Sequence, residues 1–277
     1  MKARARILNR DGVNQLAEGA DGYFLYNIHD RYIGASIAKY GEYSGLEAGF
    51  FRRLCATGDV VIEVGANIGA HTVGIAKAVG PSGRVLAFEP QRIVFQMLCA
   101  NIALNCLANV DCHHAAVGAL HGSITVPEVD FNRPNNFGAV SLLETVQGLE
   151  VPCMTLDGLR PVSRVNLLKI DVEGMEMEVI KGGMELIGEF KPFLYVENDQ
   201  PEKSEALMRL IDSMGYRMHW DCPPLFNPEN YFGEKENIFG SAGSFNLFCV
   251  HRSVAMQVTN GLEVSDFSSH PLRDRRP

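Results

Sequence analysis

The chain alternates between short apolar runs and longer segments in which apolar residues recur every three or four positions. The apolar runs predict strands at 60–64, 84–88, 109–117, 166–170, 193–198, 216–220 and 245–250. The periodic segments predict helices at 70–79, 91–105, 175–182 and 204–214, with Val94, Phe95, Leu98, Ile102 and Leu104 of the second one facing the core. Strands that alternate with helices predict an α/β fold, with a mostly parallel sheet and helices on both faces.

Two regions depart from this alternation. Residues 1–58 hold a predicted strand at 22–27 and a predicted helix at 42–54, and we expect them to cap the sheet. Residues 122–148 are rich in proline, asparagine and glycine, which predicts two short strands around a long loop. The predicted organisation is a cap (1–58), an α/β domain (59–252) with the insert 122–148, and a tail (253–277) whose charged end, 270–277, frays.

The first predicted strand ends in the strongest ligand-binding signal of the chain. It is apolar except for Glu63, and a turn that contains Gly65 and Gly69 leads from it into the next helix. Glycines there let the backbone turn sharply and approach a ligand closely. The following strand ends in Glu89, about 20 residues past the glycine turn, where an acid commonly binds a pair of ribose hydroxyls. The stretch therefore predicts a nucleotide-type ligand.

Two such ligands fit this layout, and the residues favour one of them. A dinucleotide fingerprint needs a second glycine where this chain has Asn67. The chain therefore lacks the motif of an NAD-dependent dehydrogenase. Glu63 would also repel a pyrophosphate. S-adenosylmethionine carries an ammonium and a sulfonium, which an acidic rim suits. The remaining alternative is a tight strand–helix turn without a ligand.

A second group of acids ends the strands that follow. The strand 166–170 delivers Asp171 and Glu173 to the carboxyl edge of the sheet, and the strand 193–198 delivers Glu197. In open α/β sheets ligands bind at that edge. We therefore predict Asp171, Glu173 and Glu197 as candidate general bases, with His71 as a weaker one. In the cap, Tyr40, Tyr43 and Glu47 are candidates for ligand contact, with plain packing as the alternative.

Composition narrows the possible partners. The net charge of −8 and the pI of about 5.5 weigh against nucleic acid as the main partner. No apolar run is long enough to span a bilayer, and the basic N-terminus lacks the apolar core of a secretory signal. Seven scattered cysteines without a C-x-x-C pair favour a reducing, cytoplasmic setting. Cys99, Cys106 and Cys112 lie near His113 and His114, but their spacing fits no zinc finger, so core packing is the preferred interpretation.

Taken together, the motifs EVGANIGAHT (63–72), VLAFEP (85–90) and LLKIDVEGMEMEVIKGG (167–183) resemble the FkbM family of S-adenosylmethionine-dependent methyltransferases. The resemblance extends over about 23–250 and implies a class I, Rossmann-like sheet of seven strands whose last strand, 245–250, is reversed. It also implies methylation of a hydroxyl on a sugar or natural-product scaffold. At the motif position of Glu63, aspartate is the commoner residue in this family.

The resemblance also implies roles for individual residues. The expected cofactor-binding residues are Glu63, Gly65, Ala66, Asn67, Gly69, His71, Thr72, Glu89, Pro90, Ala116 and Asp171. The expected catalytic residues are Asp171, Glu173 and Glu197. The insert 122–148 and the loop 222–241 are expected to define a small-molecule acceptor, and a homodimer is one assembly to consider. A non-catalytic module that binds S-adenosylmethionine or a nucleotide is the alternative function.

A metal-assisted mechanism is a further alternative. In catechol-type O-methyltransferases, which share this fold, an aspartate and an Asp-Asn pair hold Mg²⁺. Asp171, Glu197 and Asn198 stand at the matching strand ends. Glutamate is longer than aspartate, and carboxylates at a sugar-binding edge need no metal to be satisfied. We therefore expect no metal at this site.

Overall fold

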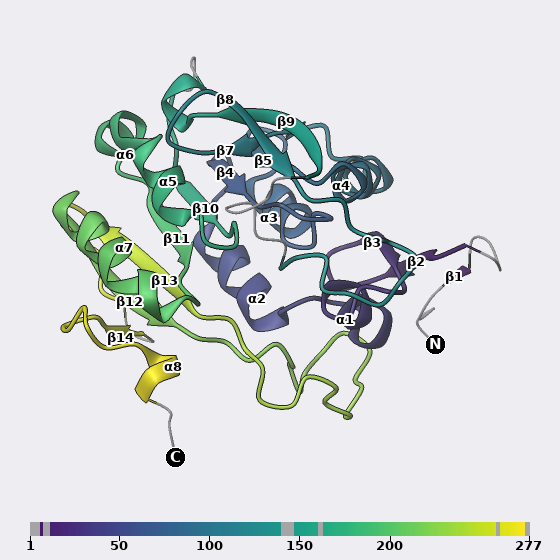
Figure 1. Cartoon of the computed structure of the whole chain (residues 1–277). Coiled ribbons are helices and arrows are strands. Elements are labelled where there is room, and N and C mark those ends of the chain that lie inside the picture. The colour runs from purple at the N-terminus through teal and green to yellow at the C-terminus, as the bar shows by residue number, and fades with distance from the viewer. Residues whose placement is uncertain (1–5, 8–11, 140–146, 160–162, 259–260, 275–277) are drawn as a thin grey trace.

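The computed structural model describes residues 6–7, 12–139, 147–159, 163–258 and 261–274, and a large mixed sheet forms its centre (Figure 1). The spatial order of its strands is β14 (Leu262–Glu263), β12 (Tyr216–Asp221), β13 (Asn246–His251), β11 (Phe193–Glu197), β10 (Leu167–Ile170), β4 (Val60–Val64), β5 (Arg84–Phe88) and β6 (Val110–His113). Strand β13 runs antiparallel to both neighbours, whereas β11, β10, β4, β5 and β6 pair in parallel. The expected class I sheet with a reversed last strand is confirmed, and β14 adds an eighth, unpredicted edge strand.

Helices cover both faces of this sheet because successive strand residues point to opposite sides. Val61 packs toward α2 (Gly45–Leu54) and α3 (Thr72–Val79). Ile62 packs toward α5 (Glu176–Lys181), α6 (Met184–Phe190) and α7 (Pro201–Ser213). Strand β4 is therefore buried on both sides, which its nearly continuous apolar sequence predicts.

Helix α4 (Arg92–Leu104) packs against the N-terminal segment as well as the sheet. Val94, Leu98 and Ile102 are buried as predicted. Leu104 was predicted to face the core and is 43% exposed, so that prediction is wrong. It occupies the last position of the helix, where the chain turns away toward Asn105.

The N-terminal segment forms a small sheet of its own. Its strands are β1 (Arg6–Ile7), β2 (Asn14–Glu18) and β3 (Tyr23–Asn27), all antiparallel, and α1 (Ile33–Tyr40) follows. Strand β3 has no strand partner on its outer side in the described part of the chain. The side chain of Asn101 on α4 takes that place: its Oδ1 accepts from Leu25 N–H at 2.6 Å, and its Nδ2 donates to Leu25 O at 3.0 Å. Figure 1 shows this small sheet beside α4.

A third sheet follows β6 and corrects one predicted strand. The strand predicted at 109–117 is two strands, because the chain leaves the central sheet after His113 and β7 (Ala116–Val117) pairs with β9 (Leu149–Met154). Strand β8 (Gly122–Val126) completes this sheet, and the short 3-10 helix η1 (Leu156–Gly158) follows it. Of the two short strands predicted within 122–148, β8 is confirmed; its partner β9 begins at Leu149, after the insert, and residues 140–146 lie outside the described residues.

The end of the chain is more ordered than predicted. His270 is 1% exposed, its Nε2 donates to the carbonyl oxygen of Asn198 at 2.8 Å, and α8 (Pro271–Asp274) follows. The expected fraying from residue 270 is therefore wrong for 270–274, whereas 275–277 lie outside the described residues. Within the described part of the chain, no helix has the length and apolar character that a membrane crossing requires.

Candidate active site

A cavity of about 720 Å³ opens at the carboxyl edge of the central sheet. Its wall combines the ends of β4, β5, β10 and β11 with three segments from elsewhere in the chain. These are the N-terminal segment around Tyr43, the insert around Gly138, and the loop that leads into β13. The cavity therefore lies where the strand ends of a parallel sheet place a ligand.

The turn after β4 exposes bare backbone to this cavity. Gly65 has φ +85°, and a Cβ atom there would lie 1.7 Å from the carbonyl oxygen of Asp171. Asn67 stands where a dinucleotide fingerprint has glycine, with φ 50° and its Oδ1 accepting from Ile68 N–H at 2.8 Å. Asparagine tolerates this left-handed conformation better than most residues do. The turn can therefore hold a ligand closely without a second glycine.

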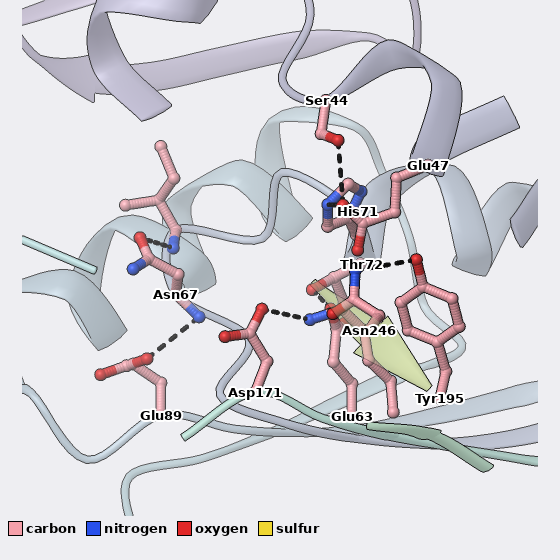
Figure 2. A network of polar contacts seen from close by, with 12 residues as sticks. Ser44, Glu47, Glu63, Asn67, His71, Thr72, Glu89, Asp171, Tyr195 and Asn246 are labelled. Carbon is pink, nitrogen blue, oxygen red and sulfur yellow. Dashed lines mark hydrogen bonds and ion pairs between the residues drawn. The ribbon is translucent and has the colours of Figure 1, made fainter. Parts of the chain in front are cut away.

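Glu89 connects the end of β5 to that turn. It is 3% exposed, and its two carboxylate oxygens accept from Asn67 N–H at 3.0 Å and from Gln91 N–H at 2.8 Å. Burial raises the pKa of Glu89 to about 7, although these hydrogen bonds act in the opposite direction. Figure 2 shows Glu89 and Asn67 joined on one side of the site.

A buried lysine lies at the centre of the site. Lys169 of β10 is 2% exposed, lies directly beside Glu63 in the strand register, and donates to Asp171 Oδ2 at 3.0 Å. Its Nζ is 3.8 Å from Glu63 Oε1, and Thr72 Oγ1 donates to Glu63 Oε2 at 2.7 Å. A buried ammonium needs such partners.

The lysine also sets the charge of Asp171. Burial works against the ionised carboxylate, but the charge and hydrogen bond of Lys169 outweigh it and hold the pKa of Asp171 below its usual value. The Asp171 side chain keeps 41% of its surface accessible, and it lines the cavity. Asp171 is therefore an ionised carboxylate that a ligand can reach, and Figure 2 shows it among the polar side chains of the site.

Helix α2 contributes a further buried carboxylate. Glu47 is 4% exposed, accepts from Ser44 Oγ at 2.9 Å, and has His71 Nε2 at 3.8 Å from its Oε2. Burial, followed by the nearby charge of Asp171, raises the pKa of Glu47 to about 7, against the effect of Lys169. Burial, followed by the charge of Lys169, lowers the pKa of His71 to about 3, so that imidazole is neutral at physiological pH.

Three more carboxylates gather near Asp171 on the cavity wall. Oxygen atoms of Glu173, Glu197 and Asp199 lie within 4.8 Å of one another, and no lysine or arginine of the described chain pairs with them. Burial and the neighbouring Asp171 raise the pKa of Glu173 to about 8 and that of Glu197 well above its usual value. Burial therefore favours the protonated forms of these carboxylates, and the group suits hydroxyl-bearing or cationic ligands.

The three residues of the metal alternative do not come together. The Asn198 side chain is buried away from the cavity wall, and its Nδ2 donates to Ser204 Oγ of α7 at 2.8 Å. Asp171 and Glu197 line the cavity, but Asn198 does not. Seven cysteines are free, and the described residues contain no cysteine–histidine group with the geometry of a metal site.

Comparison with known families identifies the family to which this chain belongs. The sequence model of the methyltransferase FkbM domain matches residues 63–218, more than half of the chain. The chain belongs to the FkbM methyltransferase family. The match begins at Glu63 and includes the glycine turn, Glu89, Asp171 and Glu197. The central residues of the site therefore lie within the region that matches the FkbM model.

Individual relatives are more distant. "Methyltransferase 1" of Beauveria bassiana (strain ARSEF 2860) is 29% identical over 143 residues, which are 44% of this chain and 57% of that protein. "Methyltransferase sdnD" of Sordaria araneosa is 29% identical over 175 residues, 51% of this chain and 66% of that protein. The chain thus aligns with less than two thirds of either relative. A crystal structure of an FkbM methyltransferase from Methylobacillus flagellatus KT covers 73% of this chain and 50% of its own, with 16% identity and a TM-score of 0.46.

Most residues predicted for an FkbM site line the one cavity. They are Glu63, Gly65, Ala66, Asn67, His71, Glu89, Pro90, Ala116, Asp171, Glu173 and Glu197. Gly69 and Thr72 are not on its wall. Gly69 faces Leu98 of α4, with φ +83°, and Thr72 is fully buried beneath Glu63. These two residues support the FkbM turn from behind.

Sequence reasoning missed Lys169. A lysine inside an otherwise apolar strand is a signal, since a fully buried lysine requires a paired acid. Its partner could be found by aligning β10 with β4, which sets Lys169 beside Glu63. Glu47 was named only as a candidate for contact, because its approach to the cavity depends on how α2 packs.

Proposed function

We propose that this chain is an S-adenosylmethionine-dependent methyltransferase that methylates a hydroxyl group of a sugar or natural-product acceptor. One observation carries the proposal: a single cavity holds the predicted cofactor residues Glu63, Gly65 and Glu89 together with the strand-end acids Asp171 and Glu197. Membership of the FkbM family supports the same class of activity.

The chemistry of the residues fits this cofactor. Gly65 lies on the cavity wall, where it lets the turn pass close to the Asp171 backbone, and Glu89 offers a carboxylate of the kind that binds ribose hydroxyls. Carboxylates outnumber the one buried lysine around the cavity, which favours a ligand with cationic groups. When bound, S-adenosylmethionine supplies a methyl group whose carbon–sulfur bond breaks as a carbon–oxygen bond to the acceptor forms, with the electron pair left on sulfur and the acceptor proton passed to a base.

The residues of this chain would orient the acceptor and take up its proton. Asp171 is ionised and accessible, so it can accept a hydrogen bond from the acceptor hydroxyl. Glu173, with a pKa of about 8, is matched to proton uptake near neutral pH. Both are candidate bases, and burial raises the pKa of the neighbouring Glu197 well above its usual value. A hydroxyl acceptor fits because the carboxylates on the cavity wall can accept hydrogen bonds from it.

The domain division remains part of the proposal. Residues 1–58 would act as a cap, since Tyr32, Tyr43 and Glu47 reach the cavity from there. The insert 122–148 reaches it with Asn136, and the loop 222–241 with Leu225. We propose that these segments define the small-molecule acceptor. Cytoplasmic location and a homodimer stay predictions.

The first prediction tests cofactor binding at Glu89. Titration calorimetry with S-adenosylmethionine should show saturable binding to the wild type. Glu89→Ala should weaken that binding by about 1.5–3 kcal/mol, since it removes hydrogen bonds to a charged group. Glu150→Ala, at an exposed glutamate on β9 outside the cavity, is the control and should bind as the wild type does. Unchanged affinity in Glu89→Ala would refute this assignment.

Turnover separates an enzyme from a binding module. Incubation with S-adenosylmethionine and a fractionated extract of hydroxyl-bearing metabolites should release S-adenosylhomocysteine, and NMR of the product should place the new methyl group on oxygen. A methyl group on nitrogen would overturn the acceptor class. Binding without turnover across all fractions would favour the module.

A further inference from the structure

Helix α2 brings a charged residue to the cavity from outside the part of the chain that matches the FkbM family. Glu47 precedes the matched region 63–218, is 4% exposed, and lines the cavity beside His71. The Ser44 hydroxyl holds its carboxylate at 2.9 Å. Glu47 is therefore a fixed part of the wall, and neither the predicted cofactor site nor the strand-end acids include it.

The charge of Glu47 has no full counter-charge in the described chain. Lys169, the one buried lysine among the described residues, forms its ion pairs with Asp171 and Glu63, at 3.0 and 3.8 Å. In the part of the chain that the structure describes, the only basic side chain paired with Glu47 within 4 Å is that of His71, at 3.8 Å, and this imidazole is neutral because burial lowers its pKa to about 3. The single ammonium of Lys169 can neutralise only one of the negative charges of the three carboxylates Glu47, Glu63 and Asp171. This wall is therefore short of positive charge.

A buried carboxylate without a counter-charge is costly, so its charge responds to whatever enters the cavity. The pKa of Glu47, about 7, means that this carboxylate is partly protonated at neutral pH. A cationic ligand would favour the ionised form, and a neutral one would not. The titratable and charged groups that face Glu47 from the neighbouring elements are Tyr43, His71, Lys169, Asp171, Tyr195 and Asp221.

We propose that Glu47 interacts electrostatically with the sulfonium of the cofactor. The site would then bind S-adenosylmethionine more tightly than S-adenosylhomocysteine, whose sulfur is a neutral thioether. This inference rests on the proposed function. The two ligands share the same ammonium, carboxylate and nucleoside, and they differ by the methyl group and its charge. A carboxylate that responds to that charge would hold the substrate form and release the product form after transfer.

The test is the ratio of two affinities. Calorimetry gives the Kd of S-adenosylhomocysteine divided by the Kd of S-adenosylmethionine for each variant. Glu47→Gln, which keeps size and hydrogen bonding, should lower this ratio by about tenfold, the size of one moderately screened charge interaction. Glu47→Asp keeps the charge and should retain most of the ratio. Glu176→Gln is the matched control, because Glu176 is a buried glutamate that does not line the cavity, and the ratio should stay unchanged.

Proton linkage gives an independent reading. Calorimetry near pH 7 in buffers of different ionisation enthalpy should show that S-adenosylmethionine releases more protons on binding than S-adenosylhomocysteine does, and Glu47→Gln should reduce this difference.

Several outcomes separate this inference from the proposed function. If Glu47→Gln weakens both ligands equally, or leaves the ratio at the wild-type value while its circular dichroism stays native, the inference is wrong and the proposed function stands. If Glu47→Gln does not fold, the Glu47→Asp ratio and the wild-type proton release decide the matter. If neither ligand binds the wild type, the proposed function itself fails.

Discussion

Lys169 illustrates how one residue determines the properties of its neighbours. It lies in β10, a central strand of the sheet, where it is buried from water. Glu63 beside it on β4 and Asp171 at the end of β10 stabilise its charge. Burial would lower its pKa, but Asp171 and Glu63 raise it instead. In return, the ammonium holds the pKa of Asp171 below its usual value, while burial and the charge of Asp171 raise the pKa of Glu197. Groups whose pKa values are driven apart in this way often divide acid and base roles.

This arrangement predicts a separation of binding from turnover at Asp171. Asp171→Asn keeps the shape of the side chain but cannot take up a proton, so turnover should fall by about 10²-fold or more. The Kd of S-adenosylmethionine should change less than tenfold. Initial rates of S-adenosylhomocysteine release, with calorimetry alongside, measure the two effects. Glu173→Gln and Glu197→Gln are the comparison variants, and the assignment to Asp171 fails if it retains turnover while either of them loses it.

The acids at the strand ends were predictable from the sequence. The roles of Lys169 and Glu47, which lie beside them, were not. Glu63, Glu89, Asp171 and Glu197 follow apolar runs, and parallel strands bring their carboxyl ends to one edge. Finding Lys169 required the register between two strands that lie more than 100 positions apart in the chain. Glu47 depends on helix packing, which sequence periodicity does not specify.

At the scale of elements, α4 does more than cover the sheet. Asn101 is fully buried, and its side chain binds both backbone groups of Leu25 on β3 and also donates to Ile68 O at 2.8 Å. It therefore connects the N-terminal sheet to the turn that faces the cavity. Asn105, one helical turn later, makes the same pair of bonds to Tyr23, but at an exposed position.

These two asparagines form a matched pair for a stability measurement. Asn101→Leu should lower the free energy of unfolding by about 2–3 kcal/mol, because it leaves one buried and two partly buried backbone groups without partners. Asn105→Leu should cost about 1 kcal/mol or less, because water can replace its exposed hydrogen bonds. Urea unfolding followed by circular dichroism measures both. Equal losses in the two variants would mean that burial of the bonds is not what matters.

Local patterns predicted the main strands and helices, and non-local pairing explains the errors. The apolar runs of β4, β5, β10 and β11 were found because strands buried on both faces need them. The break between β6 and β7 has no local signal, since it depends on the pairing of Ala116 with Cys153 in β9. Strand β14 has two residues, and pairing with β12 alone defines it.

At the scale of the whole molecule, the cavity concentrates carboxylates that are costly to ionise. Burial raises the pKa of Glu47 and Glu89 from an ordinary value of 4.5 to about 7, and that of Glu173 to about 8. The unfolded chain ionises these groups near 4.5, so between 4.5 and 8 the folded chain holds more protons than the unfolded one. Its stability must then fall as the pH rises through that interval.

The last prediction concerns the interval from pH 6.5 to 8.5, where these carboxylates dominate. His71 acts in the opposite direction, but its ordinary pKa of 6.5 confines its effect mainly to lower pH. The raised pKa of Lys169 affects stability only near and above its ordinary value of 10.5. The unliganded protein should therefore lose on the order of 1 kcal/mol from each of Glu47 and Glu89 across the interval.

Urea midpoints at pH 6.5, 7.5 and 8.5 measure this loss, and Glu47→Gln should make it smaller. Saturating S-adenosylmethionine should also make the loss smaller, because a cation in the cavity stabilises the ionised carboxylates. The same measurement on Glu150→Ala, which leaves the cavity intact, should reproduce the wild-type slope. Stability that rises with pH over this interval would show that the buried carboxylates are already compensated in the unliganded protein.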